Sequence, residues 1–385
     1  MGAFVSAFGD NLTWLALPWF VLERSGSGAA VGAVLLCYAL PASITGPIIG
    51  RLLDRYQPRT IMIVDNVLRA GLVATIPALA FAGWLQLWMV FVLAVLSGAL
   101  APATQIGMRV LVPAMMQRDD LEAANGALAW TMQVPIVFAP ALSGAIVAAW
   151  GAPASLALDA LSFLVMAWAL LRAPEVSRVS QAQAEDGHKR ATSLRILRDY
   201  PVVILLTSLS LAFFFAYGPL EASLAVHAKQ RLHVNADGFG LLWSVLGVGA
   251  VLGSLGVTWL GQRRRPGLVL AIIVALWGAA QFSIGLSTSL PMALVSMFVG
   301  GVIWGPYTAL ETSLIQRVVP PERHGQVFGA RLSLTMPAAP LGTALGGLAL
   351  TVLQPNMVIM ISGLLCVGVG LINANRITLR NLTRA

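Results

Sequence analysis

Four ionisable residues lie within long apolar runs of the sequence: Asp10, Asp65, Arg69 and Asp159. A charge in a hydrocarbon environment is costly, so such residues usually pair with one another or take part in function. Asp10 lies twelve residues before Leu22, where its run ends, which is about 18 Å along a helix. A carboxyl group at that depth can bind and release a proton, which is the chemistry of proton coupling.

Each of these residues also has a structural interpretation. Asp10 with its neighbour Asn11 could instead hydrate or cap a helix. Asp65 and Arg69 are four residues apart and share a helix face, so we expect them to form an ion pair. That pair belongs either to a charge relay or to static packing. Asp159 either lines a cavity or is a packed polar residue.

Two further acidic residues, Glu221 and Glu311, fall near the ends of apolar runs. We expect them near opposite membrane surfaces, in surface or gate roles. Five tryptophans inside the runs could line a cavity for an amphiphilic substrate or could face lipid. They are Trp130, Trp168, Trp243, Trp277 and Trp304.

A polar segment with distinctive spacing follows the second apolar run: Gly50-Arg51-Leu52-Leu53-Asp54-Arg55-Tyr56-Gln57-Pro58-Arg59. Glycine allows two helices to approach closely. A carboxylate at Asp54, near Arg55 and Arg59, can form ion pairs at a membrane surface that break when helices move. The alternative is a positively charged anchor with a turn.

The elements that carry these residues must be membrane-spanning helices. Hydrophobic residues make up 58% of the 385 residues and charged residues 10%, against about 25% charged in soluble proteins. About 20 apolar residues are needed for each span. Twelve runs meet this need, with approximate ranges 1–22, 29–50, 60–82, 86–108, 126–149, 152–172, 201–224, 238–260, 267–287, 290–312, 328–352 and 355–375. We therefore predict an all-α membrane protein with twelve transmembrane helices.

Lysine and arginine predict the orientation of these helices. Most of the 24 basic residues fall in the connections after even-numbered runs and in the C-terminal tail. Basic loops stay on the cytoplasmic side, so both termini are expected in the cytoplasm. The scatter of these residues between apolar runs argues against a nucleic-acid-binding face.

The longest polar connection, 173–200, divides the chain into six spans and six spans. We expect an N-terminal six-helix bundle over 1–172, a cytoplasmic linker over 173–200 with a short amphipathic helix at its end, and a C-terminal bundle with a short cytoplasmic tail over 201–385. The halves also resemble each other, because Arg55 aligns with Arg263 and Pro58 with Pro266. Two such parallel halves are typical of transporters that work by alternating access. Small-residue pairs that predict close helix packing are Gly46/Gly50, Gly249/Gly253, Gly301/Gly305 and Gly342/Gly346.

The segment from Gly50 to Arg59 resembles the signature loop of the major facilitator superfamily, G-x-L-A-D-R-x-G-R-R. Gly50, Leu52, Asp54, Arg55 and Arg59 agree with that pattern, whereas Gln57, Pro58 and Thr60 depart from it. The resemblance implies the major facilitator fold and a gating role for this loop.

Other segments look like the drug-efflux branch that includes macrolide-efflux and enterobactin-exporter proteins. They are VDNVLRAG around Asp65 and Arg69, the run from Leu111 to Asn125, and the run from Val319 to Gly325. The segment from Pro140 to Gly144 is similar to the antiporter motif of drug:proton exchangers, with Ala139 where that motif has glycine.

These observations predict a bacterial inner-membrane secondary transporter that exports a hydrophobic or amphiphilic small molecule against an inward proton flow. Uptake or uniport of a polar metabolite is the alternative within this class, and a membrane receptor or scaffold is the alternative outside it. No nucleotide-binding or hydrolase motif occurs, and the four histidines lack ligand spacing. We therefore expect no enzymatic activity, no nucleotide, metal or cofactor, the proton gradient as energy source, and a monomer.

Overall fold

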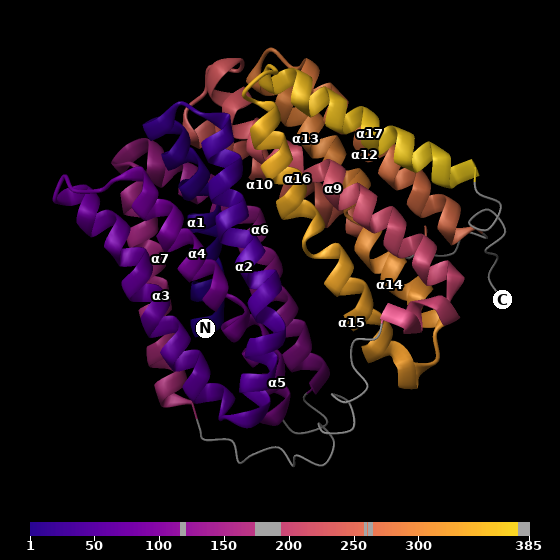
Figure 1. The fold of residues 1–385 in the computed structure, drawn as a ribbon, viewed down its shortest axis with the longest axis horizontal. Coiled ribbons are helices and arrows are strands. Elements are labelled where there is room, and N and C mark those ends of the chain that lie inside the picture. Colours follow the sequence, from indigo (N-terminus) through magenta and orange to yellow (C-terminus); the bar gives the residue numbers. More distant parts are fainter. Residues whose placement is uncertain (116–120, 174–193, 258–259, 261–264, 376–385) are drawn as a thin grey trace. The chain divides into compact units, whose positions relative to one another are not determined.

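The computed structural model describes residues 1–115, 121–173, 194–257, 260 and 265–375. Every regular element in these residues is helical (Figure 1). Ten helical segments in this part of the chain are long and apolar enough to cross a bilayer. The prediction of an all-α membrane protein is therefore confirmed.

The helices follow the apolar runs of the sequence. In the first half they are α1 (Gly2–Ser25), α2 (Gly28–Arg55), α3 (Pro58–Phe81), α4 (Leu87–Leu100), α5 (Pro102–Met115), α6 (Leu121–Trp150) and α7 (Ala152–Arg172). In the second half, η3 (Leu194–Asp199) precedes α9 (Pro201–Gln230), α10 (Ala236–Ser254), α12 (Pro266–Leu286), α13 (Leu290–Trp304), α14 (Tyr307–Val318), η4 (Pro321–Arg323), α15 (His324–Thr335), α16 (Ala338–Ala349) and α17 (Pro355–Asn375).

Three of the expected spans are interrupted helices. A proline at the start of α5 (Pro102) separates it from α4, Pro306 separates α13 from α14, and Pro337 separates α15 from α16. Proline lacks the N–H that would continue the helical hydrogen-bond ladder, and its ring clashes with the preceding turn. Counting each interrupted pair as one span gives the twelve expected spans within the described residues.

Contacts divide the chain into two compact units. Unit 1 comprises Met1–Gly26, Ala33–Asp186 and Asn235–Ser244, and unit 2 comprises Ser27–Gly32, Gly187–Val234 and Val245–Ala385. Most of the expected linker, residues 174–193, and the C-terminal tail from 376 lie outside the described residues.

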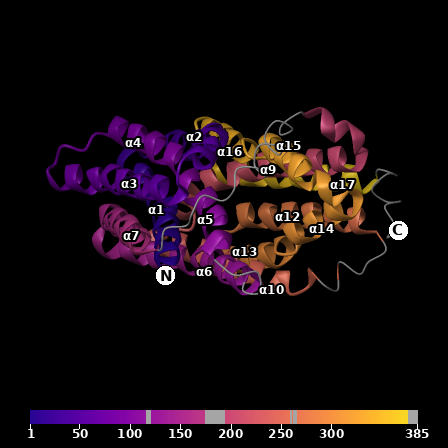
Figure 2. The ribbon, with the colours of Figure 1, turned by 90° about the horizontal axis from the view of Figure 1, so that it is seen from below.

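In unit 1, α7 packs against both α1 and α3, and α1 also packs against α6 (Figures 1 and 2). Met62 of α3, Leu111 of α5 and Met166 of α7 are buried together in one apolar cluster. Because α7 contacts both α1 and α3, the helices that carry Asp10, Asp65 and Asp159 are packed together.

In unit 2, α12 packs along α17, and α9 packs against α16 and α17 (Figure 2). Three of the predicted glycine pairs lie at such contacts: Gly249/Gly253 and Gly301/Gly305 face each other across α10 and α13, and Gly342/Gly346 face α9. Those predictions are confirmed.

The prediction of close packing at Gly46/Gly50 is wrong. No described atom lies within 4 Å of a Cβ placed at either glycine. The neighbouring side chains Ile44 and Ile48 are exposed, and α4 approaches this part of α2 on another side, where Thr45 Oγ1 donates a hydrogen bond to the carbonyl of Ala99 at 2.7 Å.

Candidate functional site

An ion pair links α1 to α3 inside unit 1. A guanidinium nitrogen of Arg69 contacts Asp10 Oδ1, with the Arg69 side chain 1% exposed and that of Asp10 29% exposed. The ion pair predicted between Asp65 and Arg69 is therefore corrected: Arg69 reaches across to α1. Sharing a helix face places two side chains on the same side but does not make them partners, because the long arginine side chain can reach a neighbouring helix.

The carboxyl group of Asp65 turns instead toward α5. Its Oδ2 accepts a hydrogen bond from Thr104 Oγ1 at 2.6 Å, and Asn66 Nδ2 donates to the same hydroxyl oxygen at 2.7 Å. Asp65 Oδ1 is buried and has no hydrogen-bond partner among the described residues. Burying a carboxyl group with a hydrogen bond to only one of its two oxygens costs free energy. That cost depends on whether the Asp65 carboxyl group is charged or protonated.

Asp159 on α7 is fully buried and is held by two hydroxyl groups. Thr13 Oγ1 of α1 donates to its Oδ2 at 2.5 Å, and Ser162 Oγ donates to its Oδ1 at 3.1 Å. Close approach of the two helices is possible because Gly9 faces Ser162 and Asp159, where a Cβ would collide with both side chains. The Arg69 guanidinium lies 4.1 Å from the centroid of the neighbouring Phe163 ring.

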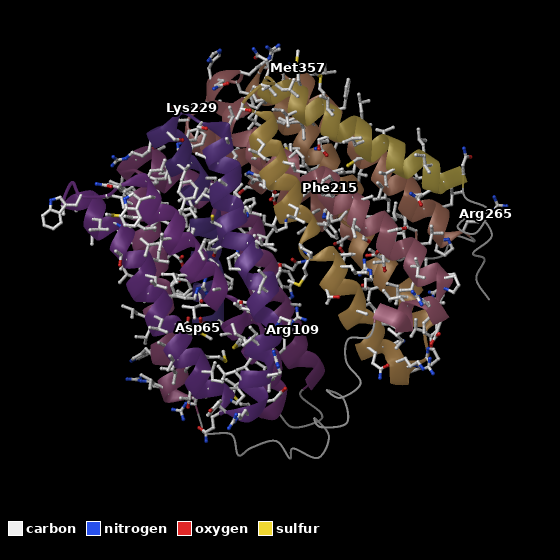
Figure 3. All side chains as sticks on the ribbon, in the orientation of Figure 1. Asp65, Arg109, Phe215, Lys229, Arg265 and Met357 are labelled. Atoms are coloured by element: carbon white, nitrogen blue, oxygen red, sulfur yellow. The ribbon has the colours of Figure 1, made fainter. Side chains whose placement is uncertain are left out.

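We call Asp10, Asp65, Arg69 and Asp159 the Arg69 cluster; Figure 3 labels Asp65 within it. All three carboxyl groups act electrostatically on Arg69. One guanidinium compensates one carboxylate, so the cluster becomes neutral only when two protons or two other positive charges are bound. Because uncompensated charge is costly in a low-dielectric site, this arrangement is suited to binding protons. In the part of the chain that the structure describes, no set of three His, Cys, Asp or Glu side chains could hold a metal ion.

The hydroxyl groups of this site were missed by sequence reasoning. Ser162 lies three residues after Asp159, so its hydrogen bond to that carboxyl group could have been predicted from the spacing. Thr13 reaches Asp159 from another helix, and no spacing in the sequence connects the two. A small cavity beside the cluster is lined by Thr13, Tyr38 and Ser97 together with apolar side chains.

The signature loop is a tight connection between α2 and α3. Pro58 occupies the first turn of α3, where its missing N–H costs nothing, so this departure from the family pattern is locally favourable. Arg59 Nε donates to the carbonyl of Leu170 at 2.8 Å, and its Nη2 donates to that of Leu171 at 2.7 Å. Arg59 thus caps the C-terminal end of α7, where a cation also complements the helix dipole.

The remaining members of this loop are more exposed. Asp54 and Arg55 are exposed in the last turn of α2, and the Arg55 guanidinium lies 5.7 Å from the Tyr56 ring. Gly50 lies one turn earlier and meets no described neighbour.

The antiporter-like segment lies in the middle of α6, which contains Pro140. Gly144 packs against the backbone of Ala236, and Gly240 packs against the backbone of Pro140. The N–H of Ala141 donates to Ser244 Oγ at 2.9 Å. All these residues belong to unit 1, and the two glycines allow α6 and the start of α10 to touch.

Unit 2 contains a buried ion pair that sequence reasoning also missed. Arg331 of α15 pairs with Glu311 of α14, and both side chains are at least nine-tenths buried. Ser210 of α9 donates to Glu311 and accepts a hydrogen bond from Arg331 at 2.9 Å, and the Tyr307 hydroxyl lies 3.0 Å from Ser210 Oγ. The assignment of Arg331 to the basic residues of the connections is wrong, because it belongs to α15 and its guanidinium pairs with Glu311 inside unit 2.

The chain matches proteins of known type along most of its length. A profile of the Major Facilitator Superfamily matches residues 1–343 and 220–381. The multidrug efflux pump Tap of Mycolicibacterium fortuitum is 27% identical over 360 residues, covering 90% of this chain and 86% of that protein. Macrolide efflux protein A of Streptococcus pyogenes is 21% identical over 379 residues, covering 96% and 93%.

Solved structures show the same fold. The nucleoside transporter NupG, as a mutant, aligns with a TM-score of 0.78 at 12% identity over 97% of both chains. A bacterial homologue of the iron transporter ferroportin, in an inward-facing state, aligns with a TM-score of 0.72 at 20% identity, also over 97% of both chains. Together with the twelve spans and the family match, these alignments show that the chain is a multi-pass membrane transporter of the Major Facilitator Superfamily.

Proposed function

We propose that this transporter exports a hydrophobic or amphiphilic small molecule in exchange for protons, by alternating access. The observation that carries the proposal is the Arg69 cluster, in which three carboxyl groups share one guanidinium inside membrane-spanning helices. The efflux pumps among the relatives support the direction of transport.

The geometry suggests how the cluster couples proton flow to movement. Asp10 is the most exposed member, whereas Asp65 and Asp159 are buried, so protons enter at Asp10. Protonation of Asp10 removes its charge and frees Arg69 to move toward Asp65 or Asp159. Because Asp10 and Asp159 lie on α1 and α7, this exchange of partners changes the contacts of α3 with both helices.

The signature loop and the antiporter-like segment would control the movement. Arg59 fastens the start of α3 to the end of α7, and Asp54 and Arg55 form ion pairs that differ between the two states of the cycle. Pro140 and Gly144 hold α6 against the start of α10 in one of these states.

We further propose the setting in which this activity occurs. The protein lies in the bacterial inner membrane as a monomer with both termini in the cytoplasm, because basic residues concentrate in the corresponding loops. The proton gradient supplies the energy, transport rather than catalysis is the activity, and neither nucleotide nor nucleic acid is a partner.

Purified protein in lipid vesicles tests the function. A cationic dye, ethidium, and a neutral dye, Nile red, are offered to vesicles under an imposed pH gradient of either sign. We expect gradient-driven accumulation in the compartment from which protons leave, with simultaneous loss of the gradient. Transport of neither dye in either direction would overturn the proposal, and accumulation of a dye in the compartment that protons enter would favour uptake.

A further inference from the structure

Glu221 is an acidic residue inside unit 2 that the coupling mechanism does not use. It lies on α9, nine residues before the end of that helix at Gln230. Figure 3 shows Phe215 part-way along α9 and Lys229 at its end. Thr343 Oγ1 of α16 donates to Glu221 Oε2 at 3.0 Å. Among the described residues, Glu221 has no salt-bridge partner within 4.0 Å, unlike Asp10 and Glu311.

Glu221 belongs to a face of α9 that also carries Ser210, Phe214 and Tyr217. Side chains at these positions point within about 60° of one another, at 100° per residue. The exposed Ile204, Leu211 and Phe215 lie about 120° further around the same helix. The exposed Ser208 lies beside them, with its hydroxyl donating to the Leu205 carbonyl of the same helix. Because a carboxylate facing hydrocarbon is costly, we expect the face with Ile204, Leu211 and Phe215 toward lipid and the face with Glu221 turned away from it.

Aromatic rings continue this face above Glu221. Tyr217 is stacked on Phe213 with 6.2 Å between ring centroids, Phe213 on Trp304 with 4.4 Å, and Trp304 on Tyr307 with 4.8 Å. Phe213 and Tyr307 are buried, whereas Phe214, Tyr217 and Trp304 are only partly buried. The stack of rings therefore has a buried side and a partly exposed side. Tyr217, on the partly exposed side, lies one helical turn before Glu221.

Resting on the transport function proposed above, we infer that Glu221 and the accessible rings of Phe214, Tyr217 and Trp304 bind the positively charged, ring-bearing part of the substrate. The substrate class is an amphiphilic organic cation. Its charge lies against Glu221, whose Oε1 accepts no hydrogen bond from the described residues. Its rings stack on the aromatic edges, and cation–π attraction adds to the ion pair.

Binding of two matched probes to purified full-length protein tests this inference. Tetraphenylphosphonium carries a charge and four rings, and triphenylphosphine oxide has similar rings without a charge. We expect Glu221→Gln to weaken tetraphenylphosphonium binding about tenfold or more and to change triphenylphosphine oxide binding less than about twofold. Tyr217→Leu should weaken both probes, and Tyr217→Phe should weaken neither.

Asp199→Asn is the control, because it removes an exposed carboxylate of unit 2 that only pairs at the surface with Arg323. Equal loss of both probes in a folded Glu221→Gln protein would overturn the inference, as would unchanged tetraphenylphosphonium binding. Gradient-driven transport of Nile red by a protein that binds no tetraphenylphosphonium would overturn this inference alone. Absence of all transport would overturn the function on which it rests.

Discussion

Asp10 and Arg69 are 59 positions apart in the chain and form an ion pair between α1 and α3. Arg69 is buried and rests against Phe163, so its charge depends on nearby carboxyl groups for compensation. This pair joins the most exposed acid of the Arg69 cluster to its one cation. It is therefore the place where a change of protonation most directly alters helix contacts.

The coupling energy of this pair is measurable by a double-mutant cycle. Arg69→Met leaves three carboxyl groups without a cation and should cost about 2–4 kcal/mol of stability. Combining it with Asp10→Asn should cost less than the sum of the single changes, by about 1–3 kcal/mol. Thermal unfolding in detergent gives these differences.

The exposed pair Asp199–Arg323 provides the matched control cycle. Its side chains are 60% and 51% exposed, so the variants Asp199→Asn and Arg323→Gln should show almost no coupling. Additive unfolding shifts for Asp10→Asn and Arg69→Met would mean that the two groups do not interact in the protein.

Proton coupling should fail in Asp10→Asn. The amide mimics a permanently protonated carboxyl group, so the variant should bind substrate and exchange it passively but not concentrate it under a pH gradient. Substrate accumulation and decay of the pH gradient are measured in the same vesicles. Normal gradient-driven accumulation by this variant would transfer the role of proton carrier to Asp159, which Thr13 and Ser162 hold.

Asp54→Asn should abolish most transport while leaving expression and membrane insertion intact. Asp54 is exposed in the last turn of α2, so the folded protein loses little, whereas the loop loses the carboxylate that pairs with arginines in one state of the cycle. Transport rates in vesicles, normalised to protein content, test this. Asp199→Asn serves as the reference, and equal rates in both variants would remove the gating role of Asp54.

Two glycine-to-alanine changes should have opposite effects. In Gly301→Ala the new methyl group would collide with the backbone of Leu246 on α10, and the unfolding temperature should fall. In Gly46→Ala the methyl group meets no described atom, and the change should be neutral or stabilise the protein by up to about 1 kcal/mol. Equal effects would show that the contact of α10 with α13 tolerates a larger separation.

The lengths of the apolar runs predicted the helices well, because a hydrocarbon core requires long apolar segments whatever their partners are. The charged residues of the Arg69 cluster were also identified, since a charge in an apolar run is conspicuous. Their pairing was not predicted. Arg69 could reach Asp65 on its own helix or Asp10 on another, and only the packing of α1, α3 and α7 decides between them.

The role of Arg331 was mistaken for a related reason. Its position soon after the polar segment 319–325 made it resemble a loop charge, and the burial of its side chain depends on Glu311 and Ser210, which are distant in sequence. Hydroxyl partners such as Thr104 are equally hard to predict, because serine and threonine are common in membrane helices and carry no distinctive signal by themselves.

The interrupted spans have a mechanical consequence. A helix is stiff because each turn is hydrogen-bonded to the next, and this stiffness is lost locally where Pro102, Pro306 and Pro337 break the ladder. A break therefore divides each of three spans: α4 with α5, α13 with α14, and α15 with α16. In contrast, α7, α12 and α17 contain no internal proline. We expect bending during transport to concentrate at these breaks, so that the two ends of one span tilt by different amounts.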